Sequence, residues 1–132
     1  MDNTGLPWTT GGSANWFGQT TTFYSSGDAA QSGAVADNQT TWLETTVSGP
    51  GTLSFYWTVS SESGKDFLAF YIDSAEQASI SGPLYGPDLK IWIKKSYLIS
   101  SGSHTLRWQY TKDSTTSFGG DSGWVDNVVF TP

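Results

Sequence analysis

Apolar and polar residues alternate along several stretches of this chain, and a period of two predicts β-strands. Successive side chains of a strand point to opposite faces of its sheet, so the apolar members of the pattern should face the core. The alternation is clearest over residues 52–60 and 66–73, and it recurs over 104–112. The core side chains that it predicts are Leu53, Phe55, Trp57, Leu68, Phe70, Ile72, Leu106 and Trp108.

Turn residues separate these stretches. Gly49-Pro50-Gly51 and Ser101-Gly102 interrupt the alternation, and we expect the chain to reverse at both because glycine and proline favour turns. Residues 1–33 show no clear period, and residues 113–122 are expected to form a long polar loop. Further strands are predicted over residues 42–47, 77–81, 91–99 and 124–130. About seven or eight strands at this spacing are typical of an all-β, two-sheet antiparallel β-sandwich with almost no helix.

Composition excludes several classes of function. The 132 residues include no cysteine and one histidine, which excludes disulfide scaffolds, cysteine nucleophiles and multi-histidine metal centres. A chain of this length suits one core, so residues 1–132 are expected to be a single module. No apolar run approaches the roughly 20 residues that cross a bilayer, and no leader-like segment opens the chain. We therefore expect a soluble monomer, excised from a larger multidomain protein, with no membrane partner.

Charge is distributed unevenly along the chain. The net charge of −6 opposes binding to the nucleic acid backbone, so no nucleic acid partner is expected. Five of the six basic residues nevertheless fall between residues 90 and 112, on what should be the solvated faces of two neighbouring strands. These residues are Lys90, Lys94, Lys95, Arg107 and Lys112.

The order of short sequence blocks resembles a jelly-roll module that recurs in large secreted bacterial proteins. The blocks that carry the resemblance are Gly51 to Trp57, Val59 to Glu62, Phe70 to Asp73, Gly102 to Leu106, Lys112-Asp113 and Trp124 to Asn127. Such modules are similar to carbohydrate-binding and MAM-like jelly rolls and are linked to catalytic or surface domains. The resemblance implies a jelly-roll fold, a secreted or cell-surface location and polysaccharide binding.

The same resemblance implies a structural calcium ion. In similar carbohydrate-binding jelly rolls, an aspartate in the final strand binds calcium together with oxygens from an N-terminal loop. Asp126 matches that aspartate, and Asp28 or Asp37 would supply the loop oxygens. Asp121, with Asp113, flanks a glycine-rich segment that either folds over an ion or is held by hydrogen bonds to these carboxylates.

Aromatic residues out of phase with the core are the candidates for a sugar-binding surface. A pyranose stacks on a flat ring and is oriented by planar polar side chains around it. The candidates are Trp42, Tyr56, Tyr71, Tyr85, Trp92, Arg107 and Gln109. Alternation places Lys90 and Lys94 in phase with Trp92. If Arg107 joins them across a hairpin, the sheet face that carries these residues favours an anionic polysaccharide over a neutral glucan or xylan.

Catalysis is not expected. His104 is more typical of a residue that satisfies a turn than of a catalytic base, and most aspartates lie at turns. We therefore predict a non-catalytic module that targets a linked enzyme or cell to a polysaccharide. The alternatives are an adhesin or spacer module without a sugar site, and a small polysaccharide lyase or hydrolase.

Overall fold

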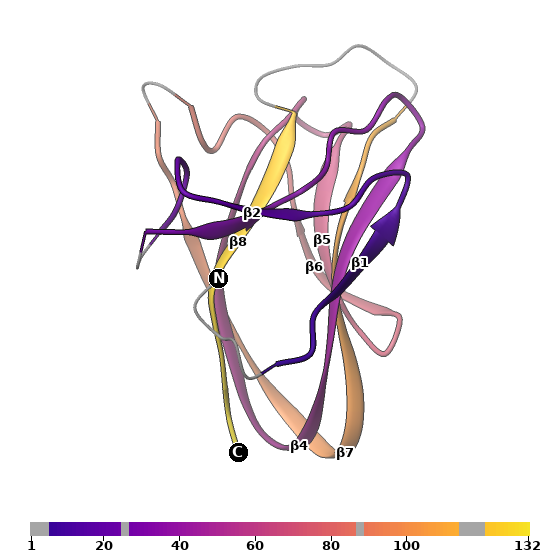
Figure 1. Ribbon diagram of the computed structural model, residues 1–132, viewed down its shortest axis with the longest axis vertical. Coiled ribbons are helices and arrows are strands. Elements are labelled where there is room, and N and C mark those ends of the chain that lie inside the picture. Colours follow the sequence, from indigo (N-terminus) through magenta and orange to yellow (C-terminus); the bar gives the residue numbers. More distant parts are fainter. Residues whose placement is uncertain (1–5, 25–26, 87–88, 114–120) are drawn as a thin grey trace.

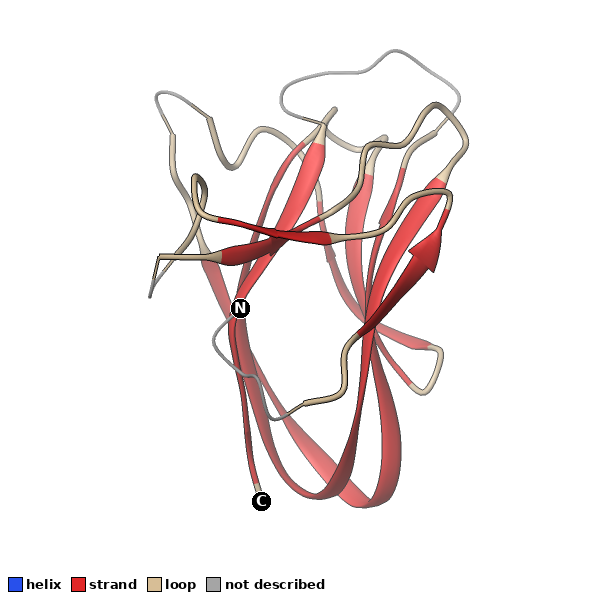
Figure 2. Ribbon diagram, in the orientation of Figure 1, coloured by secondary structure: helices blue, strands red, loops and turns tan. Residues whose placement is uncertain are grey.

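The computed structural model describes residues 6–24, 27–86, 89–113 and 121–132, which contain strands and no helix. Figure 2 shows this all-β architecture, as the alternation predicted. The strands are β1 (Thr9–Gly12), β2 (Phe17–Gln19), β3 (Ala29–Gln31), β4 (Thr40–Ser60), β5 (Phe67–Ile72), β6 (Ala75–Ile80), β7 (Ile93–Thr111) and β8 (Ser122–Thr131). Most of the polar loop predicted over 113–122 lies outside the described residues.

Two strands are much longer than the others, and they hold the molecule together. β4 and β7 run antiparallel from the pair Thr40–Thr111 to the pair Trp57–Ile93, and both bend sharply at the same level (Figure 1). At the bend, Gly49 lies opposite Gly102, which has a φ of 99°. A Cβ atom at Gly49 would overlap the carbonyl oxygen of Ser100, so only glycine fits there.

The predicted turns at Gly49-Pro50-Gly51 and Ser101-Gly102 are present as sharp bends, at which both strands fold back (Figure 1). The segments on the two sides of each bend do not pair with each other, however, as they would in a hairpin. Each strand instead keeps the same hydrogen-bonded partner on both sides of the glycine, with one register shift between Gly49 and Gly51.

The bend divides one continuous sheet into two layers. The first, which we call the β5 layer, contains β1, the first half of β4, the second half of β7, β5 and β6. The second, the β8 layer, contains β2, β3, β8, the second half of β4 and the first half of β7. The layers separate above the bend and face each other (Figure 1). The predicted two-sheet sandwich is thus confirmed, with β4 and β7 shared by both sheets.

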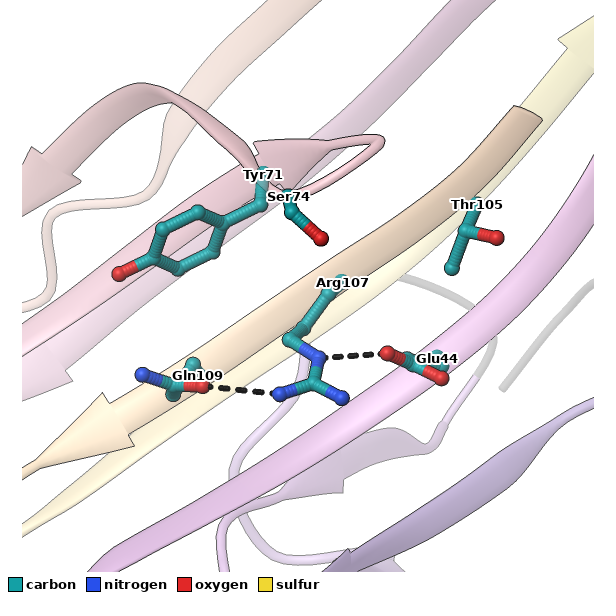
Figure 3. A pocket seen from close by; sticks show the side chains of 6 residues that line it. All are labelled: Glu44, Tyr71, Ser74, Thr105, Arg107 and Gln109. Carbon is teal, nitrogen blue, oxygen red and sulfur yellow. Dashed lines mark hydrogen bonds and ion pairs between the residues drawn. The ribbon is translucent and has the colours of Figure 1, made fainter.

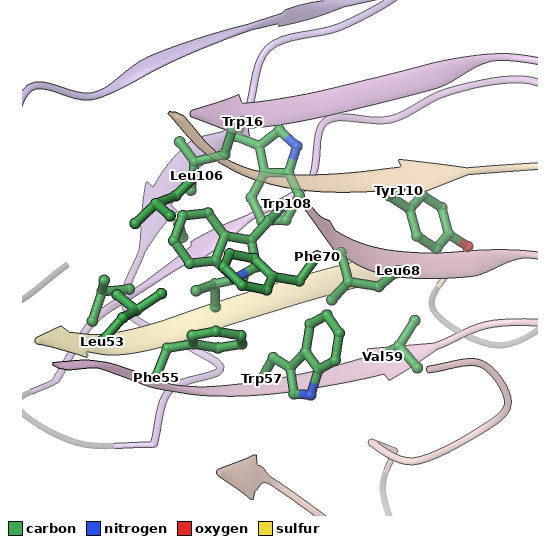
Figure 4. Close-up of a cluster of buried hydrophobic side chains, with 14 of the residues drawn as sticks. Trp16, Leu53, Phe55, Trp57, Val59, Leu68, Phe70, Leu106, Trp108 and Tyr110 are labelled. Atoms are coloured by element: carbon green, nitrogen blue, oxygen red, sulfur yellow. The ribbon is translucent and has the colours of Figure 1, made fainter. Parts of the chain in front are cut away.

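The core fills the space between the layers (Figure 4). Of the predicted core side chains, all are fully buried except Ile72, which is half-buried at the end of β5. Phe55 is central, because its ring centroid lies 5.4 Å from that of Trp57, 4.9 Å from Phe70 and 5.2 Å from Trp108. Burying such rings contributes about 1.5–3 kcal/mol each, which makes this cluster the main source of stability.

Candidate functional site

The outward surface of the β5 layer gathers four of the predicted ligand-binding residues. Trp42 lies opposite Gln109, and Arg107 lies between Glu44 on β4 and Tyr71 on β5. Because these positions share the outward phase of three adjacent strands, their side chains project on the same side of the sheet. Figure 3 shows Tyr71, Arg107 and Gln109 on this side together with Glu44. We call this surface the β5 face.

Arg107 is held at the centre of the β5 face. Its Nε donates a hydrogen bond to Glu44 Oε2 at 2.5 Å, and its Nη1 donates to Gln109 Oε1 at 3.2 Å (Figure 3). Its guanidinium carbon lies 4.4 Å from the ring centre of Trp42, within the range of a cation–π contact. The guanidinium is therefore fixed in direction, and about a third of the side chain remains exposed.

Two shallow hollows adjoin on this face. One is lined by Glu44, Tyr71, Ser74, Thr105, Arg107 and Gln109. The other is lined by Phe67, Ala69, Tyr71, Glu76, Ser79, Gln109 and Thr111. Because Tyr71 and Gln109 line both, the hollows form a single groove along β5. Ala69 offers only a methyl group on the groove floor, which leaves space between the larger side chains.

The rings on the β5 face differ in accessibility. The ring of Trp42 packs against Gly11 on one edge and is covered by Arg107. Phe67 is 37% exposed, and Tyr71 is half-buried beside Glu76. Burial, the negative charge of Glu76 and a hydrogen bond to that carboxylate raise the pKa of Tyr71, so its hydroxyl stays protonated. The groove thus offers Phe67 and Tyr71 for stacking, with Arg107 and Gln109 as polar partners.

The other three aromatic candidates lie on the β8 layer. Tyr56 stacks on Tyr24, with ring centroids 3.7 Å apart and planes inclined by 12°. Trp92 lies edge-on to Tyr24 at 6.1 Å and to Tyr85 at 6.0 Å. Tyr85 in turn packs 5.5 Å from Trp124. These rings contact one another, which covers much of the surface that a sugar would need. We call this group the β8 cluster.

The predicted union of Arg107 with Lys90 and Lys94 is wrong. Lys94 lies over the ring of Tyr56 and Lys90 over that of Tyr85, both on the β8 layer. Arg107 lies on the β5 face because the two halves of β7 do not pair with each other at Gly102 but belong to different layers. The basic residues, although close in sequence, are thus divided between two layers.

Lys112 was also expected on the solvated face of its strand, but its side chain is completely buried. Its Nζ forms an ion pair with Asp121, which also accepts a hydrogen bond from the Tyr110 hydroxyl at 2.8 Å. Burial lowers the pKa of Lys112, but the carboxylates of Asp121, Asp66 and Asp37 outweigh it and raise the pKa overall. Asp121, a predicted calcium ligand, is here the partner of a buried lysine.

Asp126, the first predicted calcium ligand, is buried at the junction of β8 and the N-terminal segment. Its Oδ1 accepts a hydrogen bond from the backbone N–H of Asn127 at 2.7 Å, and its Oδ2 accepts one from Tyr24 at 2.8 Å. Asp28 is half-buried and Asp37 exposed. N–H donors at both oxygens fit a carboxylate that fixes a backbone segment better than one that binds calcium. Calcium at Asp126 stays a prediction.

The hydrogen bonds of His104 resemble those of the histidine in a catalytic triad, but its Nε2 is not free to accept a proton. Its Nδ1 lies 2.5 Å from Asp73 Oδ2, and its Nε2 lies 3.1 Å from the Ser100 hydroxyl and 3.0 Å from the Ser100 carbonyl oxygen. A carbonyl only accepts, so Nε2 carries a proton and is not free to take one from the hydroxyl. The hydrogen bond to Asp73 raises the pKa of His104, which favours the charged form. The group is a structural ion pair.

Three residues of these surfaces were not among the predicted site residues. Tyr24 lies in a stretch without period, so no alternation could place its ring on Tyr56. Phe67 is exposed beside Tyr71, and its position out of phase with the core is a signal that could have found it. Glu44 pairs with Arg107 on the neighbouring strand, and this contact depends on strand register, which local alternation does not give.

Comparison with known proteins locates the fold among solved structures. No family model and no curated protein matches this chain. The secreted serine protease VesC from Vibrio cholerae is 13% identical to this chain, with a TM-score of 0.66. The match covers 89% of this chain but only 24% of VesC. The K3 cleaved adhesin domain of Lys-gingipain from Porphyromonas gingivalis W83 is 19% identical with a TM-score of 0.62, and 95% of this chain covers 91% of it. The module TmCBM61, solved with β-1,4-galactotriose, is 11% identical with a TM-score of 0.59. The match covers 94% of this chain and 87% of TmCBM61.

At these identities the similarity concerns the fold. The chain has the β-sandwich fold of carbohydrate-binding modules and adhesin domains, which confirms the resemblance read from its sequence. No helix in the described residues is long and apolar enough to span a membrane.

Proposed function

We propose that this chain is a non-catalytic module that binds a polysaccharide in the groove of the β5 face. The observation that carries the proposal is the fixed guanidinium of Arg107 beside the half-buried ring of Tyr71, above a floor that Ala69 keeps open. A ring stacks on the apolar face of a pyranose, and planar donors with defined direction bind its hydroxyl groups. The groove is open and shallow, as binding to part of a long polymer requires.

A neutral polysaccharide fits this groove better than an anionic one. The charge of Arg107 is paired with Glu44, and Glu76 adds a further negative charge along the groove. Lys90 and Lys94, which supported the anionic alternative, lie on the β8 layer. TmCBM61, whose fold this chain shares, was solved with a neutral galactose trimer, and a β-1,4-galactan is therefore the first polymer to test.

The same features argue against a hydrolase. Glycoside hydrolysis commonly uses two carboxylates, one of which donates a proton. Among the described residues that line the groove, the carboxylates are Glu44 and Glu76, and Glu44 is ion-paired with Arg107. We propose that catalysis, where it occurs, belongs to a linked domain of a secreted parent protein.

The test is a polysaccharide panel read by affinity electrophoresis and calorimetry, with β-1,4-galactan, xylan, a β-glucan and polygalacturonate. Tyr71→Ala is expected to weaken binding about tenfold, since stacking contributes roughly 0.5–1.5 kcal/mol beyond the area that it buries. Tyr56→Ala is the matched control because it removes the same side chain from the β8 layer. Equal loss in both variants would contradict the site. Absence of binding to every polymer would contradict the function and favour an adhesin or spacer module.

A further inference from the structure

A group of three carboxylates lies at the end of the sandwich opposite the bend. Glu62 follows β4, Asp66 precedes β5 and Asp113 follows β7. One oxygen from each lies within 4.8 Å of the others. Among the described residues, this is the group of three or more acidic or histidine side chains close enough to share a metal ion. Such a cluster of like charges requires a compensating cation or strong hydrogen bonds.

Asp66 supplies an independent sign that a ligand belongs there. The residue is completely buried, and its Oδ1 accepts a hydrogen bond from the backbone N–H of Asp113 at 3.1 Å. Its Oδ2 is buried without any hydrogen-bond partner. A buried carboxylate oxygen without a partner is costly, and natural structures seldom retain one unless water or an ion completes it.

The cluster lies near a buried lysine that is engaged by other carboxylates. The buried cation in this region is Lys112, whose Nζ is paired with Asp121 and lies 3.9 Å from Asp37. Lys112 also interacts electrostatically with Asp66. The charge of Lys112 is therefore shared among Asp121, Asp66 and Asp37.

The backbone around the cluster is already arranged. The N–H groups of Lys65 and Asp66 both donate to the Glu62 carbonyl oxygen at 3.2 Å, which closes a tight turn between two of the carboxylates. The Ser61 hydroxyl donates to the carbonyl oxygen of Asp66 at 2.9 Å, which fixes the turn to β4. The ligand set is therefore held in place by the fold, and Glu62 and Asp113 are half-buried, which gives an ion access from solvent.

We propose that Glu62, Asp66 and Asp113 form a calcium-binding site that ties the β4–β5 turn to the end of β7. Calcium prefers hard oxygen ligands and accepts irregular geometry completed by water, whereas magnesium demands a near-octahedral shell and zinc favours nitrogen or sulfur. The site is separate from Asp126, which accepts backbone N–H groups on the β8 layer. It is also independent of the β5 face, because Asp66 has the core phase of its strand and Phe67 the outward phase.

Calcium titration with a chelator control tests the site. Isothermal calorimetry of the chelated protein should detect one site for CaCl₂, and saturating calcium should raise the melting temperature by about 5 °C or more. Glu62→Gln should weaken calcium binding at least about tenfold, since it removes one charged ligand. Asp66→Asn should abolish both the heat of binding and the melting shift.

Asp126→Asn is the matched control, because it neutralises a buried aspartate outside the cluster. It should retain calcium binding and the melting shift. If circular dichroism shows that Asp66→Asn does not fold, Glu62→Gln tests the proposal in its place. Absence of binding to the unaltered protein would overturn the proposal. Binding that Glu62→Gln leaves unchanged, or that Asp126→Asn alone removes, would also overturn it. Polysaccharide binding by each variant is measured separately and does not bear on the result.

Discussion

The β5 face and the β8 cluster both present aromatic rings on the outside of a sheet, and they use them in opposite ways. In the β8 cluster, Tyr24 stacks on Tyr56 and contacts the edge of Trp92, so each ring is the partner of another. On the β5 face, Arg107 and Gln109 separate the rings of Trp42 and Tyr71. Rings that contact each other stabilise the fold, whereas rings spaced by planar polar groups leave room for a ligand.

Gly49→Ala should have the largest effect, because it removes the bend that assigns the two surfaces to different layers. The added Cβ would overlap the backbone of Ser100, and relief requires β4 and β7 to separate. We expect a loss of about 3 kcal/mol or more in the free energy of unfolding, measured by urea denaturation. Gly18→Ala is the control, since its Cβ meets no atom within 4 Å. Similar losses in both variants would contradict the role of the bend.

Arg107→Ala should separate the two surfaces by function. Removal of the guanidinium leaves the Trp42 ring uncovered and Glu44 without its partner. We expect polysaccharide binding to fall about tenfold or more by calorimetry, because hydrogen bonds from a charged donor contribute roughly 1.5–3 kcal/mol. Lys94→Ala removes a cation over an aromatic ring on the β8 layer and should leave binding unchanged. An effect of Lys94→Ala equal to that of Arg107→Ala would contradict the assignment.

Tyr24→Ala should show the reverse pattern. The variant loses the stack on Tyr56, while the backbone N–H that donates to Asp126 remains. Because Tyr24 is 44% exposed, the expected cost in unfolding free energy is only about 1 kcal/mol, and polysaccharide affinity should not change. Thermal melting and calorimetry on the same samples would measure both. Loss of affinity with unchanged stability would place a binding site on the β8 layer.

The smallest effect should come from pH, through the ion pair of His104 and Asp73. The hydrogen bond from His104 lowers the pKa of Asp73 below 3.8, and the same bond raises the pKa of His104 above 6.5. The Asp73 contribution is present above pH 3.8 and is lost as pH falls through the lowered value. The His104 contribution is present below pH 6.5 and is lost as pH rises through the raised value.

Stabilisation by this pair is therefore complete between about pH 3.8 and 6.5 and declines on either side. In His104→Gln, the pH profile of the melting temperature should lose its decline above pH 6.5 relative to the unaltered protein. Polysaccharide affinity should not follow the titration, since His104 does not line the groove. A profile unchanged by His104→Gln would contradict the pairing.

The sequence predicted well which side chains of each strand face the core, but it predicted poorly the contacts between residues that are distant in the chain. The alternation of Leu53, Phe55 and Trp57 identified buried positions because the apolar face of a strand must be covered whatever lies opposite. The same alternation failed to group Arg107 with its true neighbours, since that depends on whether the segments on the two sides of Gly102 pair with each other or keep a common partner. A glycine signals unusual backbone, but it does not identify the partner strand.

The charged residues of the candidate sites were the hardest to interpret. Asp66 and Lys112 look like ordinary residues at strand ends, and nothing nearby in the sequence indicates that both are buried. Their burial follows from the pairing of Phe67 with Thr111, which places both neighbours of that pair on the core side. Tyr24 is placed by its backbone bond to Asp126, 102 residues away. Such contacts follow from topology, which local pattern does not encode.

The shared strands β4 and β7 also govern how the molecule comes apart. In a sandwich of two separate sheets, one sheet can open by local fluctuation while the other persists. Here every hydrogen-bonded pair from Thr40–Thr111 to Trp57–Ile93 belongs to the same two strands, which run through both layers. Opening either layer frays the ladder that supports the other. The backbone amides of β4 on both sides of Gly49 should therefore share one free energy of opening in hydrogen exchange, as a single cooperative unit.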